Sequence, residues 1–217
     1  MKTTNKYSHI IWDWNGTLLN DTKWCMEVKN KMLSKRNLKT FNSLSEYRQV
    51  FCFPIKDYYI KIGFDFTKEP FEDLAIEFIN LYHYNNTGNC QLNRNSELVL
   101  ETIKQKGITQ IILSASEINN LLKQVNQFKI IKYFQEILGI SDIYAKSKID
   151  IGLDYVKRNK VEKGLLIGDT IHDYEVAMAL GIDCILIAQG HQSKERLLAC
   201  GVPVLDNLEQ IMEYIEQ

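Results

Sequence analysis

The sequence lacks any long uninterrupted hydrophobic run: nowhere among its 217 residues do about 18 apolar residues follow one another. A transmembrane helix is therefore not expected. The sequence also lacks an excess of charge of either sign, because 26 lysine and arginine residues balance 27 aspartate and glutamate residues, with a formal net charge of −1. Without polybasic runs, the chain has no strong field to attract nucleic acid or a membrane surface. We expect neither as a partner.

Paired cysteines are missing as well. The five cysteines are scattered and form no CxxC pair, at Cys25, Cys52, Cys90, Cys184 and Cys200. This spacing offers neither a zinc knuckle nor a disulfide framework. We therefore expect reduced, mostly buried cysteines in a cytoplasmic protein.

Apolar residues, by contrast, make up 45% of the sequence, which is enough for a buried core. Short segments typical of buried strands occupy residues 7–12, 110–113, 163–167, 182–187 and 202–205. Helical patterns occupy residues 97–106, 117–127, 151–160, 173–180 and 207–216. The alternation of the two predicts an α/β fold with a parallel sheet that is covered by helices on both faces.

The segment between the first and second of these strands breaks the alternation. Residues 19–90 are rich in helix formers and aromatic residues, with Pro54 and Gly63 as interruptions. This composition predicts a helical insertion after the first strand. We expect two domains, an α/β core made of residues 1–18 and 91–217 and a helical cap made of residues 19–90.

Polar residues follow three of the predicted strands. Asp13, Ser114 and Asp169 lie where the carboxyl ends of parallel strands gather functional groups. Carboxylates at neighbouring strand ends repel each other unless a cation lies between them, and their hard oxygens suit Mg²⁺. Together with Lys148 and Asp173, they predict phosphoryl transfer to Asp13 through an aspartyl-phosphate.

Three segments carry a resemblance to a known family. IIWDWNGTLLND (residues 10–21), IILSAS (111–116) and LLIGDTIHDYEVAMALG (165–181) resemble the first, second and fourth motifs of haloacid dehalogenase-like phosphatases. Their order and spacing are also similar. The resemblance implies a Rossmann-like core, and the helical insertion is similar to the cap of the phosphoglycolate phosphatase-like branch.

The resemblance implies a role for each matching residue. Asp13 would be the nucleophile and a magnesium ligand, the backbone carbonyl of Asn15 a second ligand, and Asp169 a third. Ser114 would bond to the transferring phosphoryl group. Asp173 would hold the metal site or the catalytic lysine in place through hydrogen bonds, from outside the set of direct metal ligands.

One departure from the family pattern is Asn15, which stands where the family has its general acid and base. An amide cannot exchange a proton near pH 7, and general acid–base help is worth roughly 10²–10⁴-fold in rate. Slower protonation of the leaving group is therefore expected. His172 is the alternative proton donor, although a histidine in an acidic loop is more often simply solvated.

A second departure concerns the lysine of the third motif, which precedes a proline in the family. The chain has no proline there but has two lysines, Lys146 and Lys148. Lys148 is the candidate, because it stands just before the helical pattern at 151–160. Lys146 is the alternative.

The expected substrate is a small, soluble phosphorylated metabolite, because a cap that closes over the site excludes large polymers. Substrate contacts are expected from Gly16, Thr17 and Ser114. In the cap, Arg48 would suit a carboxylate or a second phosphate, with a solvated cationic face as the alternative. We expect a monomer or a small homo-oligomer.

Two other functions stay open. Asn15 is compatible with a catalytically weak or regulatory protein that binds a phosphometabolite. Phosphonatase-type chemistry would need a reactive lysine in the cap, and the sequence does not distinguish among Lys23, Lys29 and Lys31. A dehalogenase would lack the second acidic pair, so the GDTIHD segment argues against it.

Overall fold

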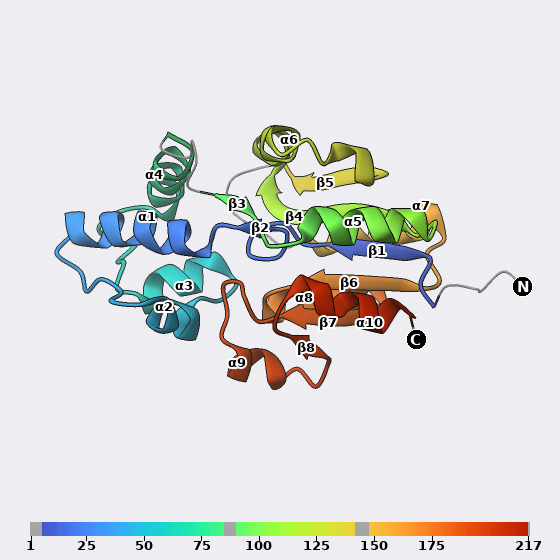
Figure 1. Cartoon of the computed structure of the whole chain (residues 1–217). Coiled ribbons are helices and arrows are strands. Elements are labelled where there is room, and N and C mark those ends of the chain that lie inside the picture. The colour runs from blue at the N-terminus through green and yellow to red at the C-terminus, as the bar shows by residue number, and fades with distance from the viewer. Residues whose placement is uncertain (1–5, 85–89, 142–147, 217) are drawn as a thin grey trace, which may run out of the picture.

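Six parallel strands form the central sheet, in the order β5-β4-β1-β6-β7-β8. The computed structural model describes residues 6–84, 90–141 and 148–216 (Figure 1). The strands are β1 (His9–Trp12), β4 (Thr109–Glu117), β5 (Glu136–Ile140), β6 (Gly164–Gly168), β7 (Asp183–Ile187) and β8 (Val204–Leu205). The predicted α/β fold with a parallel sheet is confirmed.

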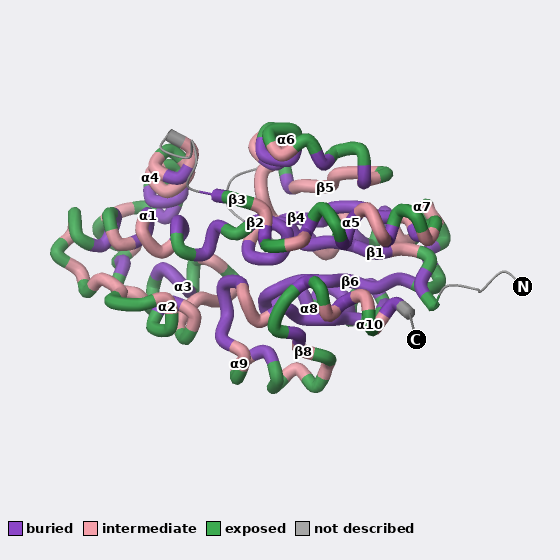
Figure 2. The backbone as a smooth tube through the Cα atoms, viewed as in Figure 1, coloured by how far each residue is buried: buried purple, intermediate pink, exposed green. Residues whose placement is uncertain are grey.

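The strands of the sheet carry apolar side chains on both faces, so helices pack on both of them. Along β1, Ile10 and Trp12 belong to one apolar cluster and Ile11 to the other, as the two-residue period of a strand requires. The first face is covered by α5 (Ser96–Gln105), α6 (Ile118–Gln127) and α10 (Ile211–Glu216). The second is covered by α7 (Ile149–Asn159), α8 (Ile171–Leu180) and α9 (Lys194–Leu198). Figure 2 shows the sheet strands β6 and β7 as buried throughout most of their length.

The helix ends follow the signals in the sequence. Gly107 follows α5 with a φ of +72°, and Gly181 ends α8 with a φ of +68°. This left-handed conformation is the one that glycine adopts readily after a helix. Asn207 accepts a hydrogen bond from the backbone N–H of Gln210, so it caps the short 3₁₀ turn Leu208–Gln210 that leads into α10.

The strand β5 is absent from the sequence prediction. Its segment, EILGI, is only half-buried over most of its length and lies at the edge of the sheet, beside β4. β4 also runs further than expected, through Ser114 to Glu117, and its pairing with β5 is irregular between Leu113 and Glu117. The irregularity lies at the end of β4, next to the predicted site.

Four helices interrupt the chain between β2 (Leu19–Asn20) and β3 (Gln91–Leu92), which pair antiparallel as a narrow stalk. They are α1 (Thr22–Lys35), α2 (Leu44–Val50), α3 (Ile55–Lys61) and α4 (Phe71–Tyr84). In Figure 1 these helices stand together on the left, apart from the sheet and its helices. The division into a core (1–18 and 91–217) and a cap (19–90) stays a prediction. Among the described residues, no helix combines the length and hydrophobicity required to cross a membrane.

Candidate active site

Asp13 lies immediately after β1, and only 8% of its surface is exposed. Its backbone N–H donates to the carbonyl oxygen of Ile167 at 2.9 Å, which ties it to the neighbouring strand β6. Lys148 Nζ donates to Asp13 Oδ1 at 2.5 Å and to the carbonyl oxygen of Leu113 at 3.0 Å. The ends of β1, β4 and β6 therefore meet around one buried carboxylate and one buried ammonium group.

Lys148 precedes the first residue of α7 and is 1% exposed. A second ion pair joins its Nζ to Asp173 Oδ1 at 2.7 Å. Burial alone would lower the pKa of Lys148, but the carboxylates of Asp13 and Asp173 raise it above its ordinary value, so the group carries its charge. Lys148 thus stands where the third-motif lysine is predicted to stand. The alternative, Lys146, lies outside the described residues.

Asp173 uses both of its carboxylate oxygens within the protein. Oδ1 pairs with Lys148, while Oδ2 accepts the N–H groups of Asp169 and Thr170 and the Thr170 hydroxyl, at 2.7–3.1 Å. Burial alone would raise the pKa of Asp173, but Lys148 and Thr170 hold it below its usual range. This bonding favours the predicted role of Asp173 in positioning the lysine over direct ligation of a metal.

The carboxylate of Asp169 is held from several sides. Its Oδ2 accepts the backbone N–H of His191 at 2.5 Å, and its Oδ1 lies 3.4 Å from the Thr17 hydroxyl. The backbones of Gly16 and Gly190 pack so closely that a Cβ on either would collide with this carboxylate. Gly16 also has a φ of +78°, which other residues rarely adopt. Glycine at both positions therefore fixes where Asp169 points.

Asp13, Asp169 and Asp173 bring carboxylate oxygens within 4.8 Å of one another, all in buried positions. Burial, and then repulsion from Asp173, raises the pKa of Asp13 to about 7 despite the nearby Lys148. Burial likewise raises the pKa of Asp169. Three buried carboxylates beside a single ammonium leave an excess of negative charge, and oxygen donors of this kind fit Mg²⁺. Asp13 and Asp169, with the backbone carbonyl of Asn15, are the residues that would hold it.

The amide of Asn15 is fixed at both ends. Its Nδ2 donates to Asp21 Oδ2 at 2.7 Å, and its Oδ1 accepts the Ser116 hydroxyl at 2.7 Å. An amide in this arrangement links the loop after β1 to β4 and to the start of α1, but it cannot carry a proton. Asp21 received no role from the sequence, although it ends the first-motif segment.

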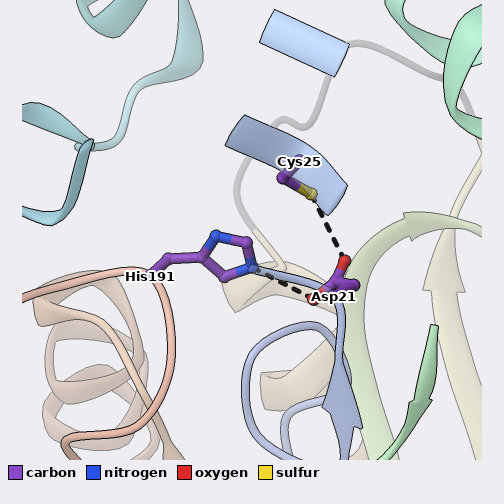
Figure 3. Close-up of side chains that lie close together, drawn as sticks. All are labelled: Asp21, Cys25 and His191. Carbon is purple, nitrogen blue, oxygen red and sulfur yellow. Dashed lines mark hydrogen bonds and ion pairs between the residues drawn. The ribbon is translucent and has the colours of Figure 1, made fainter. Parts of the chain in front are cut away.

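Asp21 lies behind Asn15 and is almost fully buried. In addition to the Asn15 amide, it accepts a hydrogen bond from the Tyr82 hydroxyl at 2.8 Å. Figure 3 shows two further bonds to Asp21, from His191 Nε2 at 3.2 Å and from the Cys25 thiol at 3.4 Å. Burial alone would raise the pKa of Asp21, but His191, Asn15 and Tyr82 hold it below its ordinary value. Asp21 therefore joins the core loops to α1 and α4 of the insertion.

His191 was missed by the sequence analysis. Its Nδ1 lies 2.8 Å from the Tyr47 hydroxyl, so the imidazole bridges Asp21 and α2. Burial alone would lower the pKa of His191, but Asp21 and then Asp169 raise it above its ordinary value. The available signal was the polar segment QGHQS directly after the predicted strand at 182–187, at the same sheet edge as Asp13.

A cavity of 180 Å³ lies between these groups and the inserted helices. From the core, its walls include Asp13, Asn15, Ser116, Lys148, Asp169 and His191. From the insertion, they include Lys29, Tyr47, Tyr58, Tyr59, Phe78 and Tyr82. The predicted nucleophile and a carboxylate predicted to bind the metal thus share a cavity with aromatic residues of α1–α4.

Three residues predicted to contact the substrate are not among the described residues that line this cavity. Gly16 packs against Asp169, and Thr17 lies within reach of the same carboxylate. The Ser114 hydroxyl accepts the backbone N–H of Ser116 at 3.1 Å, and Ser114 is 1% exposed. Neither serine caps α6, which is capped by the Glu117 side chain. The direct substrate contacts of these three residues stay a prediction.

Arg48 also lies away from the described cavity walls. Its Nε donates to the carbonyl oxygen of Gly190 at 2.8 Å, and one terminal nitrogen donates to that of Gln189 at 2.6 Å. The guanidinium therefore joins α2 to the loop after β7. This geometry lends no support to the predicted contact between Arg48 and a substrate.

His172 does line the cavity, but its surroundings do not favour the charged form. Its ring stacks on Phe53 with the centroids 4.6 Å apart, and Nδ1 lies 3.4 Å from a carboxylate oxygen of Glu175. Burial, followed by the charge of Lys148, lowers the pKa of His172 below its ordinary value. The predicted role of His172 as a proton donor stays a prediction.

Comparison with known proteins agrees with this geometry. The family model described as haloacid dehalogenase-like hydrolase matches residues 10–187. A search of curated proteins finds no match to the chain.

Among solved structures, a haloacid dehalogenase-like family hydrolase from Streptococcus pneumoniae is similar, with a TM-score of 0.82 at 17% identity, covering 96% of this chain and 98% of that one. A predicted phosphatase from Clostridium acetobutylicum has a TM-score of 0.77 at 20% identity, with the same coverage. A predicted phosphoglycolate phosphatase from Haemophilus somnus 129PT has a TM-score of 0.77 at 17% identity, covering 98% and 99%. Because the family model spans most of the sequence, the chain belongs to the haloacid dehalogenase-like hydrolase family.

Proposed function

We propose that this hydrolase is a Mg²⁺-dependent phosphatase of a small phosphomonoester, with Asp13 as the nucleophile. The observation that carries the proposal is the position of Asp13, which lies on a cavity wall with one oxygen held by Lys148 and with Asp169 beside it. A nucleophilic carboxylate needs this arrangement, because the cation that orients it also reduces repulsion from an incoming phosphate.

In the first step, the Asp13 oxygen that is not held by Lys148 bonds to phosphorus while the ester P–O bond breaks. The alcohol oxygen leaves with the electron pair and takes up one proton. Mg²⁺ held by Asp13, Asp169 and the Asn15 carbonyl would neutralise charge on the phosphoryl oxygens. Lys148, oriented by Asp173, holds the nucleophile in the attacking position.

In the second step, a water oxygen bonds to phosphorus and loses a proton, and the bond to Asp13 breaks. Inorganic phosphate leaves and the Asp13 carboxylate is restored. The family's usual proton carrier is absent, since Asn15 is an amide tied to Asp21 and Ser116. We therefore expect turnover to be slow relative to a variant with a proton carrier at this position, by up to roughly 10²–10⁴-fold.

A second candidate rests on the same amide. Asn15 is hydrogen-bonded to two other side chains, and its amide cannot act as an acid. The second candidate function is therefore binding of a phosphometabolite with little turnover. The two candidates differ in whether phosphate is released.

The deciding experiment is Mg²⁺-dependent phosphate release from p-nitrophenyl phosphate and a panel of small phosphomonoesters. We expect release that stops when EDTA removes the metal and that falls by about 10³-fold or more in Asp13→Asn, as for the loss of other enzyme nucleophiles. Asp154→Asn, a carboxylate change on the exposed side of α7, is the matched control and should leave the rate unchanged.

Two results would contradict the phosphatase. One is release that persists equally in Asp13→Asn. The other is no release by folded, Mg²⁺-loaded wild-type protein from any ester of the panel, which would favour the binding protein if a phosphometabolite still raises its melting temperature.

A further inference from the structure

A buried lysine of the insertion faces the same cavity as Asp13. Lys29, on α1, is 2% exposed and lines the cavity wall. It plays no part in the chemistry assigned to Asp13, Lys148 and Asp169. A lysine that is buried without an ion pair is uncommon, because its ammonium loses its hydration.

No carboxylate lies within ion-pair distance of Lys29 in the part of the chain that the structure describes. Among the described residues, its Nζ has the Met32 sulfur as hydrogen-bond acceptor, at 3.9 Å. Glu77, the acidic group that acts on it from α4, is already bonded to Arg36 and Lys35. The amine is therefore left without a counter-ion.

Aromatic rings surround this amine instead. Lys29 Nζ lies 3.5 Å from the ring centre of Tyr59 and 4.6 Å from that of Phe78. The attraction of a cation to such rings is smaller than the free energy lost when an ammonium group is removed from water. The rings therefore do not make up for the lost water, and burial lowers the pKa of Lys29 well below its ordinary value.

The cavity wall carries a second donor. The hydroxyl of Tyr58, on α3, is buried and has no hydrogen-bond partner among the described residues. Tyr58 is 2% exposed and lines the cavity, with its ring centre 5.7 Å from Lys29 Nζ. A buried donor without a partner is destabilising, because the group has lost its bonds to water. An amine whose acceptor is a thioether sulfur and a hydroxyl without a partner lie on the walls of one cavity, and together they indicate a place for an acceptor that the described residues do not supply.

The path from this wall to the nucleophile runs along α1. Asp21, at the N-terminus of α1, bonds to Asn15 beside the catalytic loop, and Lys29 follows eight residues later. Eight residues of helix rise about 12 Å, so Lys29 lies roughly two turns further into the insertion. A small molecule with its phosphate at Asp13 would extend its other end toward Lys29.

We propose that Lys29 and Tyr58 bind an anionic group, a carboxylate or a second phosphate, at the far end of the phosphomonoester. This inference rests on the proposed function for the position of the phosphate. The anion supplies the counter-ion that Lys29 lacks and the acceptor that the Tyr58 hydroxyl lacks. Arg48 is the residue predicted for this role from the sequence, but it donates to backbone carbonyls of the loop after β7.

The test measures binding rather than turnover, with phosphonates that cannot be hydrolysed. Calorimetry in Mg²⁺ buffer compares 3-phosphonopropionate with propylphosphonate, and 6-phosphonohexanoate with hexylphosphonate. A third comparison sets propane-1,3-bisphosphonate against propylphosphonate and separates a second phosphate from a carboxylate. We expect the anion-ended member of at least one pair to bind about 10–100-fold more tightly to the wild-type protein, as for a new charge-assisted hydrogen bond.

Matched variants assign that preference to this site. Lys29→Met should abolish it and leave binding of the neutral-ended ligand within about threefold, and Tyr58→Phe should reduce it. Lys31→Met, on the exposed side of the same helix, should keep it. Lys29→Met should also melt no lower than the wild type, because it removes an unpaired buried amine.

The inference is overturned if the wild-type protein binds the two ligands of every pair equally well. It is also overturned if Lys29→Met keeps the preference for the anion-ended ligand, or if this substitution weakens the binding of both ligands of a pair by the same factor. Covalent capture of Lys29 by phosphonoacetaldehyde and borohydride would also overturn it, since the amine would then bind a carbonyl. Asp13-dependent phosphate release without a preference would reject this inference and keep the phosphatase. A preference without any release would reject the phosphatase and keep the anion site.

Discussion

Asn15 and Asp21 form a pair of side chains in which an amide donates to a carboxylate at 2.7 Å. The family pattern has an aspartate at the position of Asn15. In this chain an aspartate there would face the buried Asp21, which already has a full set of donors. The amide is therefore matched to Asp21, and the two positions have to be considered together.

This pairing predicts the effect of restoring the acid. Asn15→Asp alone removes a donor and sets two carboxylates against each other, so we expect unfolding free energy to fall by about 1–3 kcal/mol. Combining it with Asp21→Asn exchanges donor and acceptor, and should recover most of that loss while raising phosphate release at least tenfold. Urea denaturation and steady-state kinetics measure the two effects.

The single variant Asp21→Asn completes the cycle and gives the coupling energy of the pair. A stable Asn15→Asp single variant, with no coupling to position 21, would contradict this account of the amide.

At the scale of one element, the start of α8 sets the position of Lys148, the predicted catalytic lysine. Thr170 and Asp173 form a capping box in which the Thr170 hydroxyl contacts the backbone N–H and the carboxylate of Asp173. The same carboxylate holds Lys148, which holds Asp13. The cap of a helix is thus joined to the nucleophile through two buried ion pairs.

We therefore expect Thr170→Ala to affect both stability and catalysis. Loss of a capping hydroxyl costs about 1 kcal/mol, which corresponds to roughly 2–4 °C in melting temperature for a chain of this size. The loosened Asp173 should lower kcat by about tenfold with little change in KM. Thermal denaturation and initial rates check the two parts.

The chain offers a matched control in Ser43, whose side chain caps α2 in the insertion and accepts the N–H of Glu46 at 3.2 Å. Ser43→Ala should lower the melting temperature by a similar amount without changing kcat. Equal effects of the two substitutions on kcat would show that the α8 cap has no special connection to the site.

At the scale of the whole molecule, the insertion is fastened to the core through the C-terminal end of α2. Arg196, on α9, donates to the carbonyl oxygens of Arg48 and Phe51 at 2.8 and 2.6 Å. Gln192 also donates to Phe51, and Arg48 donates back to Gly190. Carbonyls at the end of a helix have no partner within the helix, so these core side chains supply one.

Removing this connection should loosen the insertion without dismantling the core. We expect Arg196→Met to lower the unfolding free energy by about 1–3 kcal/mol, to speed amide exchange in α2 and to raise KM for the phosphomonoester. Hydrogen–deuterium exchange and steady-state kinetics measure these changes.

Arg158→Met is the control at an exposed ion pair with Glu136, where water screens the charges and little change in stability is expected. Unchanged exchange in α2 of the Arg196→Met protein would show that other contacts keep the insertion in place.

The sequence by itself determined the order of the elements and the identity of the residues at the strand ends. Short continuous apolar runs predict the strands that end at Asp13, Ser114 and Asp169, because a strand buried on both faces is apolar throughout. Glycine marks the end of α8, since the left-handed conformation of Gly181 suits few other residues. The half-buried edge strand β5 gave no comparable pattern.

Only the tertiary structure decided which of these residues meet. His191 and Asp21 are separated by 170 residues, and no local pattern indicates that they share a hydrogen bond. The same holds for Lys29, whose surroundings come from the rings of α3 and α4 rather than from its own helix. Whether a lysine is solvated or held without a counter-ion depends on what packs around it, and for Lys29 that is decided when the helices of the insertion pack against one another.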